Sequence, residues 1–162
     1  MRRVMTESAL NANRPERFQD EFDSLLQTIS KLSENSDSET AWPAEAWHEI
    51  RQAGVLGWNV PLEFGGTDLN SVEMTYGYIR LAEACLTTTF VLTQFNAACQ
   101  WINWSQDQEM KLSVFRELAA GEKFATVGIS HLTTSRQHLS KPTVTAEKVT
   151  DGWKLDGFFF FF

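Results

Sequence analysis

The sequence predicts an α+β fold: an N-terminal all-helical bundle of about five helices, followed by the first strands of a truncated β-barrel. Apolar residues recur at helical spacing between Pro15 and Gly121, and runs of Ser, Asn, Gly and Thr separate the helices. After Gly121, β-branched and alternating residues replace this pattern, in too few strands to close a barrel. We therefore divide the chain into a flexible arm at residues 1–13, a helical domain at 14–121 and an incomplete β domain at 122–162.

The helices are predicted from apolar stripes and capping signals. The first carries apolar residues at helical intervals from Phe18 to Leu32. The second begins at Trp42-Pro43, because Pro suits the first turn of a helix. Capping boxes at Asn70–Glu73 and Ser105–Gln108 predict the starts of the third and fifth helices. The three Thr before Phe90 interrupt the pattern, so we expect the fourth helix to run from Phe90 to about Ile102.

The stretch from Trp42 to Leu69 combines large apolar side chains with Gly and Pro residues that interrupt regular structure. Gly54 is placed to end the second helix in a left-handed conformation. Residues 55–60 form a short apolar run that we expect to be a buried extended link, because Pro61 cannot extend a helix into it. The dipeptide Gly65-Gly66 predicts a tight turn that brings the backbone close to another segment.

Three segments after Gly121 are strand candidates. They are residues 124–130, residues 143–149, and a segment on which Trp153 and Leu155 alternate. Asp151-Gly152 is a turn dipeptide that favours a β-hairpin between the last two. The run of Phe at residues 158–162 lacks alternation, and we interpret it as a truncation or a sequence artefact rather than a working element.

Composition and charge exclude several classes of protein. The 162-residue chain has a formal net charge of −7, which argues against general nucleic-acid binding. Its two cysteines, Cys85 and Cys99, lie in apolar helical patterns and predict core residues. No apolar run approaches about 18 residues, so we expect no membrane span. The N-terminus lacks the apolar region of a secretory signal, so we expect a cytoplasmic location.

Two glycine motifs carry a family resemblance. The second predicted helix is followed by Gly54-Val55-Leu56-Gly57 and then by Val60-Pro61-Leu62-Glu63-Phe64-Gly65-Gly66. This order resembles the N-terminal helical domain of the acyl-CoA dehydrogenases, and the likeness extends over nearly the whole chain. That family has a helical domain, a middle β-barrel and a C-terminal helical bundle. The resemblance implies that the chain holds the first, the start of the second and none of the third. A helix-to-helix turn in an unrelated bundle is the alternative interpretation.

The resemblance implies an FAD site at the end of the first barrel strand, where the family reads Thr-Glu-Pro-x-x-Gly-Ser. By position, Ser130 would supply the hydroxyl that hydrogen-bonds the flavin. The backbones of Val127 and Ile129 would face the flavin ring. The full set of implied cofactor-binding residues is Val127, Ile129, Ser130, Ser135 and Arg136.

This segment also departs from the family pattern. His131 and Leu132 stand where the family has Glu and Pro, and Ser135-Arg136 replace Gly-Ser. The loop from His131 to Lys141 is basic and contains no acidic residue. It is either a phosphate-binding loop, in which the Arg136 guanidinium donates hydrogen bonds to two phosphate oxygens, or an ordinary solvated loop. No carboxylate or Cys accompanies its two His, so we predict no metal site.

A substrate site and a reaction are implied by the same resemblance. The implied substrate-binding residues are Thr89, Leu92, Thr93, Phe95 and Asn96, which also fit plain helix packing. The reaction is α,β-dehydrogenation of an acyl-CoA or similar thioester, with an electron-transfer partner and a homo-oligomeric assembly at full length. The family's catalytic glutamate lies in the C-terminal bundle. We therefore assign no catalytic residue, and we expect this chain alone to be inactive.

Two other functions remain open from the sequence. A flavin-dependent monooxygenase that takes reduced flavin from a partner fits the altered Thr-Glu-Pro motif. A non-catalytic helical interaction module, whose β segment pairs with another chain, needs no flavin.

Overall fold

The computed structural model describes residues 14–16, 18, 20–36, 42–67, 69–128 and 144–157. The chain forms two compact units, Met1–Thr126 and Val127–Phe162. The predicted fold class is confirmed, because the described residues form five α-helices followed by two antiparallel strands.

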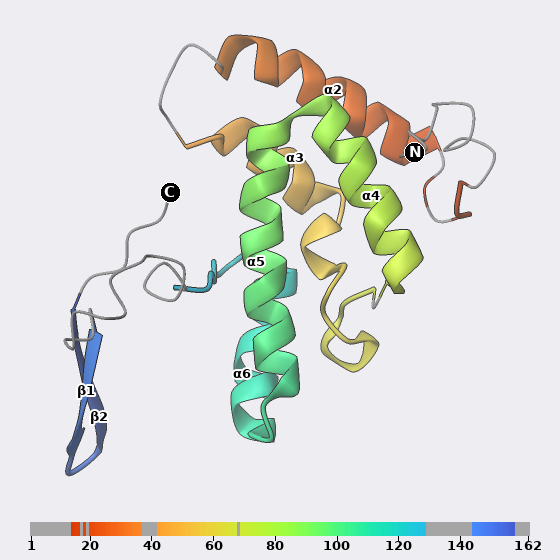
Figure 1. Ribbon diagram of the computed structural model, residues 1–162. Coiled ribbons are helices and arrows are strands. Elements are labelled where there is room, and N and C mark those ends of the chain that lie inside the picture. Colours follow the sequence, from red (N-terminus) through yellow and green to blue (C-terminus); the bar gives the residue numbers. More distant parts are fainter. Residues whose placement is uncertain are drawn as a thin grey trace, which may run out of the picture. The chain divides into compact units, whose positions relative to one another are not determined.

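The helical unit consists of α-helices linked by short segments, two of which are single 3-10 turns (Figure 1). Its elements are α2 (Asp20–Ser36), α3 (Ala44–Gln52), η1 (Val55–Gly57), η2 (Leu62–Phe64), α4 (Ser71–Ala84), α5 (Leu86–Trp104) and α6 (Gln108–Ala119). Helices α4 and α5 are joined through Cys85 alone and pack against each other. Helix α2 packs on α3 and α4, while α6 packs on α5 and on both 3-10 turns.

The core of this unit is built around Trp58. Its ring centroid lies 5.5 Å from that of Phe18 and 5.9 Å from that of Phe22. The indole also packs against Gly77 of α4, where a Cβ would lie only 2.6 Å from it.

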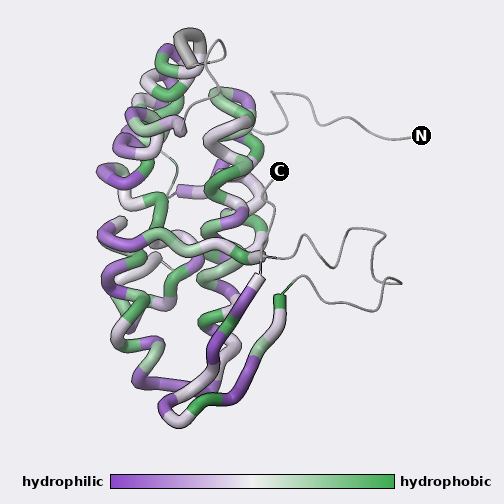
Figure 2. Tube along the Cα trace, turned by 90° about the vertical axis from the view of Figure 1, so that its left-hand side faces the viewer, coloured by the Kyte–Doolittle hydropathy of each residue, from purple (hydrophilic) through white to green (hydrophobic). Residues whose placement is uncertain are grey.

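Hydrophobic and hydrophilic positions mix along the helices (Figure 2). None of the described helices is both long and apolar enough to cross a bilayer.

The glycine-rich stretch after α3 confirms two predictions and corrects one. Gly54 has a φ of 71°, the left-handed conformation expected at the end of the helix, and Gly65 has a φ of 87°, which fits the expected tight turn. The predicted link, residues 55–60, is buried except for the half-buried Asn59, but its first part is the 3-10 turn η1 and not an extended segment. Two backbone hydrogen bonds between residues three positions apart explain the difference. The Gly57 amide donates to the Gly54 carbonyl (3.0 Å), and the Trp58 amide donates to the Val55 carbonyl (3.1 Å).

Gly66 makes the close backbone approach predicted for this turn. A Cβ on Gly66 would lie 1.9 Å from the carbonyl oxygen of Val60. The Thr67 amide donates to the Gly57 carbonyl at 2.8 Å, and the Leu69 amide donates to the Trp58 carbonyl at 2.9 Å. The chain therefore folds back on the η1 turn immediately before α4 begins.

Two predicted helix starts are wrong, and local hydrogen bonds explain both. Helix α5 begins at Leu86, four residues early, because the Cys85 Sγ accepts a hydrogen bond from the Thr88 amide at 3.5 Å and caps the helix. The N-cap of α6 is Asp107 and not Ser105. The Asp107 carboxylate accepts a hydrogen bond from the Met110 amide, in the first turn of the helix, at 2.9 Å.

The second unit contains an antiparallel hairpin of β1 (Val144–Val149) and β2 (Gly152–Gly157). Its two-residue loop is Thr150-Asp151, one position before the predicted Asp151-Gly152. All but the first of the strand residues are exposed. A two-stranded hairpin is only marginally stable by itself.

The strand expected at residues 124–130 is not formed in its described part. Residues 124–128 have no regular secondary structure, and residues 129–130 lie outside the described residues. The Phe124 ring packs instead on Trp42 and Trp47, with ring centroids 5.4 Å apart in both pairs. Aromatic contacts with Trp42 and with Trp47 of α3, and not sheet pairing, hold Phe124.

Candidate functional site

A polar pocket lies between α4, α5 and the segment that precedes α4. We call it the α4–α5 pocket. Its volume is about 430 Å³, within the range of ~300–1,000 Å³ that is typical of small-molecule sites. No charged side chain is among the described residues that line it. They are Asn59, Leu69, Ser71, Met74, Tyr78, Thr93, Asn96, Ala97 and Gln100.

Asn96 is the most deeply buried polar group of this pocket, with 2% of its surface exposed. Its side-chain Nδ2 donates to the Tyr78 hydroxyl at 2.7 Å and approaches the Met74 sulfur at 3.9 Å. Its backbone carbonyl accepts a hydrogen bond from the Asn59 side chain at 2.7 Å. The side-chain oxygen of Asn96 is buried and has no hydrogen-bond partner in the described part of the chain.

The Tyr78 hydroxyl keeps its proton across the physiological pH range. Burial raises the pKa of Tyr78, the hydrogen bond from Asn96 lowers it, and the neighbouring Cys99 raises it further. The protonated hydroxyl accepts from Asn96 and still has its own O–H to donate. Burial also raises the pKa of Cys99 to about 12, so this thiol is not a nucleophile near neutral pH.

The structure brings two of the five predicted substrate-binding residues to this pocket, Thr93 and Asn96. Leu92 and Phe95 are fully buried in the core. Thr89 is also buried, and its hydroxyl donates to the Cys85 carbonyl at 2.8 Å. These three side chains are buried in the helical unit, and they are not among the residues that line the pocket.

Sequence reasoning missed the pocket residues outside α5. Tyr78 is the main one, because its position among the apolar residues of α4 is typical of a core aromatic. Asn59 lies inside the apolar run at residues 55–60, where a lone amide was the one available signal. Neither residue could be joined to Asn96 without the packing of α4 on α5.

Most of the predicted cofactor-binding residues lie outside the described part of the chain. These are Ile129, Ser130, Ser135 and Arg136. Val127 is described; it is half-buried and belongs to no helix or strand. The FAD site therefore stays a prediction.

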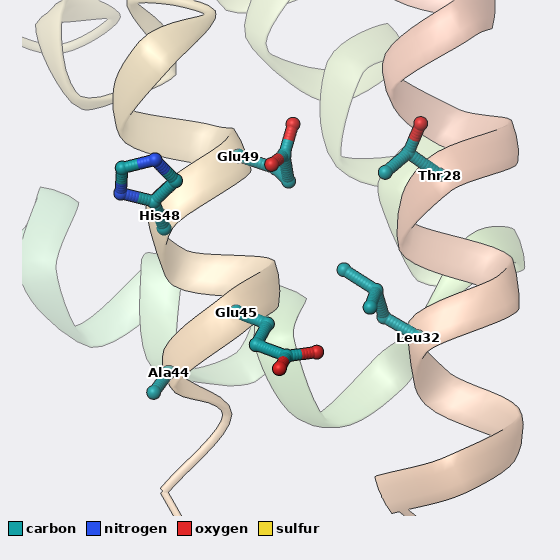
Figure 3. Close-up of a pocket in the computed structure, with 6 residues that line it drawn as sticks. All are labelled: Thr28, Leu32, Ala44, Glu45, His48 and Glu49. Carbon is teal, nitrogen blue, oxygen red and sulfur yellow. The ribbon is translucent and has the colours of Figure 1, made fainter.

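A second hollow, of about 350 Å³, lies between α2 and α3 (Figure 3). Glu45 and Glu49 extend from α3 toward α2, whereas the His48 ring is turned to another side of the helix (Figure 3). The described residues include no group of three or more His, Cys, Asp and Glu side chains suited to a metal ion. We interpret this hollow as a surface groove between two helices.

Comparisons with known proteins agree with the glycine motifs and the helical fold. Residues 14–122 match the family model of the acyl-CoA dehydrogenase N-terminal domain. The amino sugar nitrososynthase RubN8 of Streptomyces rubradiris is 26% identical over 143 residues, which cover 84% of this chain and 32% of that protein. The chain thus spans about a third of the length of this relative. By its match over most of its length, the chain belongs to the acyl-CoA dehydrogenase family, whose N-terminal helical domain it carries.

Proposed function

We propose that this chain is the helical part of a flavin-dependent oxidoreductase that uses FAD. The family match over residues 14–122 is the observation that carries the proposal. Ser130, Ser135 and Arg136 would hold the cofactor, together with the backbone of Val127 and Ile129. Val127 lies outside helices and strands, which fits a backbone group that is free to face a ring. Flavin, when bound, supplies a two-electron acceptor.

The reaction that the family implies is α,β-dehydrogenation of an acyl-CoA thioester. Four large apolar side chains exposed on α5 support this proposal, because exposed apolar side chains can contact an acyl chain. They are Leu86, Phe90, Trp101 and Trp104, each more than half exposed. A complete enzyme would take its catalytic base from outside this chain, and we assign none here.

Oxidation of an amine is the second candidate, and two observations favour it. A similar protein is named as an amino sugar nitrososynthase, and formation of a nitroso group adds oxygen to nitrogen. The neutral polar lining of the α4–α5 pocket suits a polar substrate better than an acyl chain. Dioxygen and reduced flavin would be the co-reactants.

The two reactions separate in one spectroscopic experiment on the protein expressed from its complete reading frame and loaded with FAD. Under anaerobic conditions, butyryl-CoA should bleach the yellow oxidised flavin if the protein is a dehydrogenase. If it oxidises amines, butyryl-CoA should leave the spectrum unchanged. A glucosamine substrate should then increase dioxygen uptake after the flavin has been reduced chemically. A protein that shows neither response would overturn both proposals.

A further inference from the structure

We propose that the α4–α5 pocket binds a neutral, hydroxyl-rich ring such as a pyranose sugar, with Asn96 and Tyr78 as its recognition pair. The inference rests on the proposed function in taking the pocket as a substrate site, and it deepens that function by naming the substrate class. Three properties of the pocket support it: its lining chemistry, an unpaired buried amide and a prearranged hydrogen-bond framework.

The described lining residues carry no formal charge. Among the described lining residues, no Lys, Arg or His side chain could pair with a phosphate or carboxylate, and no Asp or Glu could pair with an ammonium group. Burying an ion there without a partner would be costly. The polar lining groups are hydroxyls and amides, which can both donate to and accept from sugar hydroxyls. Leu69, Met74 and Ala97 add apolar surface for the faces of the ring.

The Asn96 amide has an unused hydrogen-bonding group. Tyr78 can pair with only one of the two amide atoms, whichever way the amide is turned. The other is left buried and unpaired, which costs stability in a folded protein. The terminal torsion of Asn is broad, so the amide can turn toward a ligand. A ligand hydroxyl that donates to the Asn96 oxygen would recover the missing hydrogen bond.

The neighbouring groups are already arranged for such a ligand. The Asn59 side-chain amide donates a hydrogen bond to the backbone carbonyl of Asn96 at 2.7 Å. The Thr93 hydroxyl donates to the Phe90 carbonyl at 2.6 Å, so its lone pairs are left to accept from a ligand. Tyr78 retains a proton to donate. The pocket therefore offers one donor, the Tyr78 hydroxyl, and two acceptors, the side-chain oxygens of Asn96 and Thr93, and sugar hydroxyls can bond to both kinds of group.

Titration of the purified chain with methyl β-D-glucopyranoside, followed by amide NMR, tests the inference without any flavin. We expect saturable shifts at Tyr78, Asn96 and Gln100. Cyclohexanol, which has a similar ring and a single hydroxyl, and octanoate, which mimics an acyl chain, should not shift these amides at the same concentrations. Equal binding of either probe, or no saturable shift with the glucoside, would overturn the inference.

Substitutions on α5 provide matched controls. Asn96→Leu should weaken glucoside binding by about tenfold or more. The change removes the buried unpaired oxygen and also the hydrogen bond to Tyr78, so the melting temperature of the variant is measured beside its affinity. Asn103→Leu makes the same change at an exposed position of α5 outside the pocket and should bind like the wild type.

Gln100 provides a second variant in case Asn96→Leu does not fold. Gln100 is exposed, so Gln100→Ala should fold normally and still weaken binding. Full affinity in both pocket variants would overturn the inference. Because this titration contains no flavin, its failure would leave the flavin proposal standing, and loss of flavin binding would not alter its result.

Discussion

Substitution of Gly66 by Ala should be among the most destabilising changes in the helical unit. The new Cβ would lie 1.9 Å from the Val60 carbonyl oxygen and 2.5 Å from the Val60 Cβ. Reaching an ordinary C···O separation of ~3.3 Å would require a retreat of roughly 1.4 Å. The obstacle is mainly backbone, which cannot move away as a flexible side chain can. We expect a loss of about 3 kcal/mol or more in the free energy of unfolding.

The neighbouring glycine provides a matched control. Gly65 has a φ of 87°, but a Cβ there would have no atom within 4 Å. Gly65→Ala should therefore cost only the left-handed backbone conformation, about 1–2 kcal/mol. With a slope of about 2 kcal/mol per M in urea, the denaturation midpoint should fall by about 1.5 M or more for Gly66→Ala and by about 0.5–1 M for Gly65→Ala. Equal midpoints, or a lower midpoint for Gly65→Ala, would refute this reasoning.

Two further predictions concern capping and ionisation. Asn70→Ala removes the capping box of α4, in which Asn70 accepts amides of the first turn and Glu73 bonds back to the Asn70 amide. Urea denaturation should show a loss of about 1 kcal/mol, and an unchanged midpoint would contradict the capping role. Burial raises the pKa of Cys99 from 9.0 to about 12, so the folded state holds this proton more tightly than the unfolded chain does. The free energy of unfolding should therefore be insensitive to this group below pH 9 and fall as the pH rises from 9 toward about 12. Cys99→Ala should reduce that fall. If the free energy of unfolding of the variant falls with pH as steeply as that of the wild type, the prediction for Cys99 is wrong.

The features predicted well from the sequence depend on local chemistry. The capping box at Asn70 and the left-handed turns at Gly54 and Gly65 need only residues a few positions apart. The predictions that failed depended on less common chemistry. Cys85 caps α5 with a thiol, a group rarely expected in that position, so the helix start was placed too late. Phe124 lies in an apolar segment that suggests a strand, but it packs on two Trp rings.

The candidate site was harder to predict than the fold. Leu92 and Phe95 lie on the same helix as Thr93 and Asn96, but only the latter two line the pocket. Which side of α5 faces the pocket depends on how α4 packs against it. That packing also brings Tyr78 within hydrogen-bonding distance of Asn96 across 18 positions of sequence. No local spacing rule connects two residues so far apart.

Whether the protein binds flavin is the central question, and titration with FAD answers it most directly. The protein expressed from its complete reading frame is titrated while quenching of flavin fluorescence is followed. We expect saturable quenching by the wild type and by Arg116→Ala, a control on the exposed side of α6. Arg136→Ala should bind FAD more weakly, because it lacks the guanidinium group proposed to hold the phosphates. Absence of saturable quenching in the wild type would contradict the proposal that the protein is a flavin-dependent oxidoreductase.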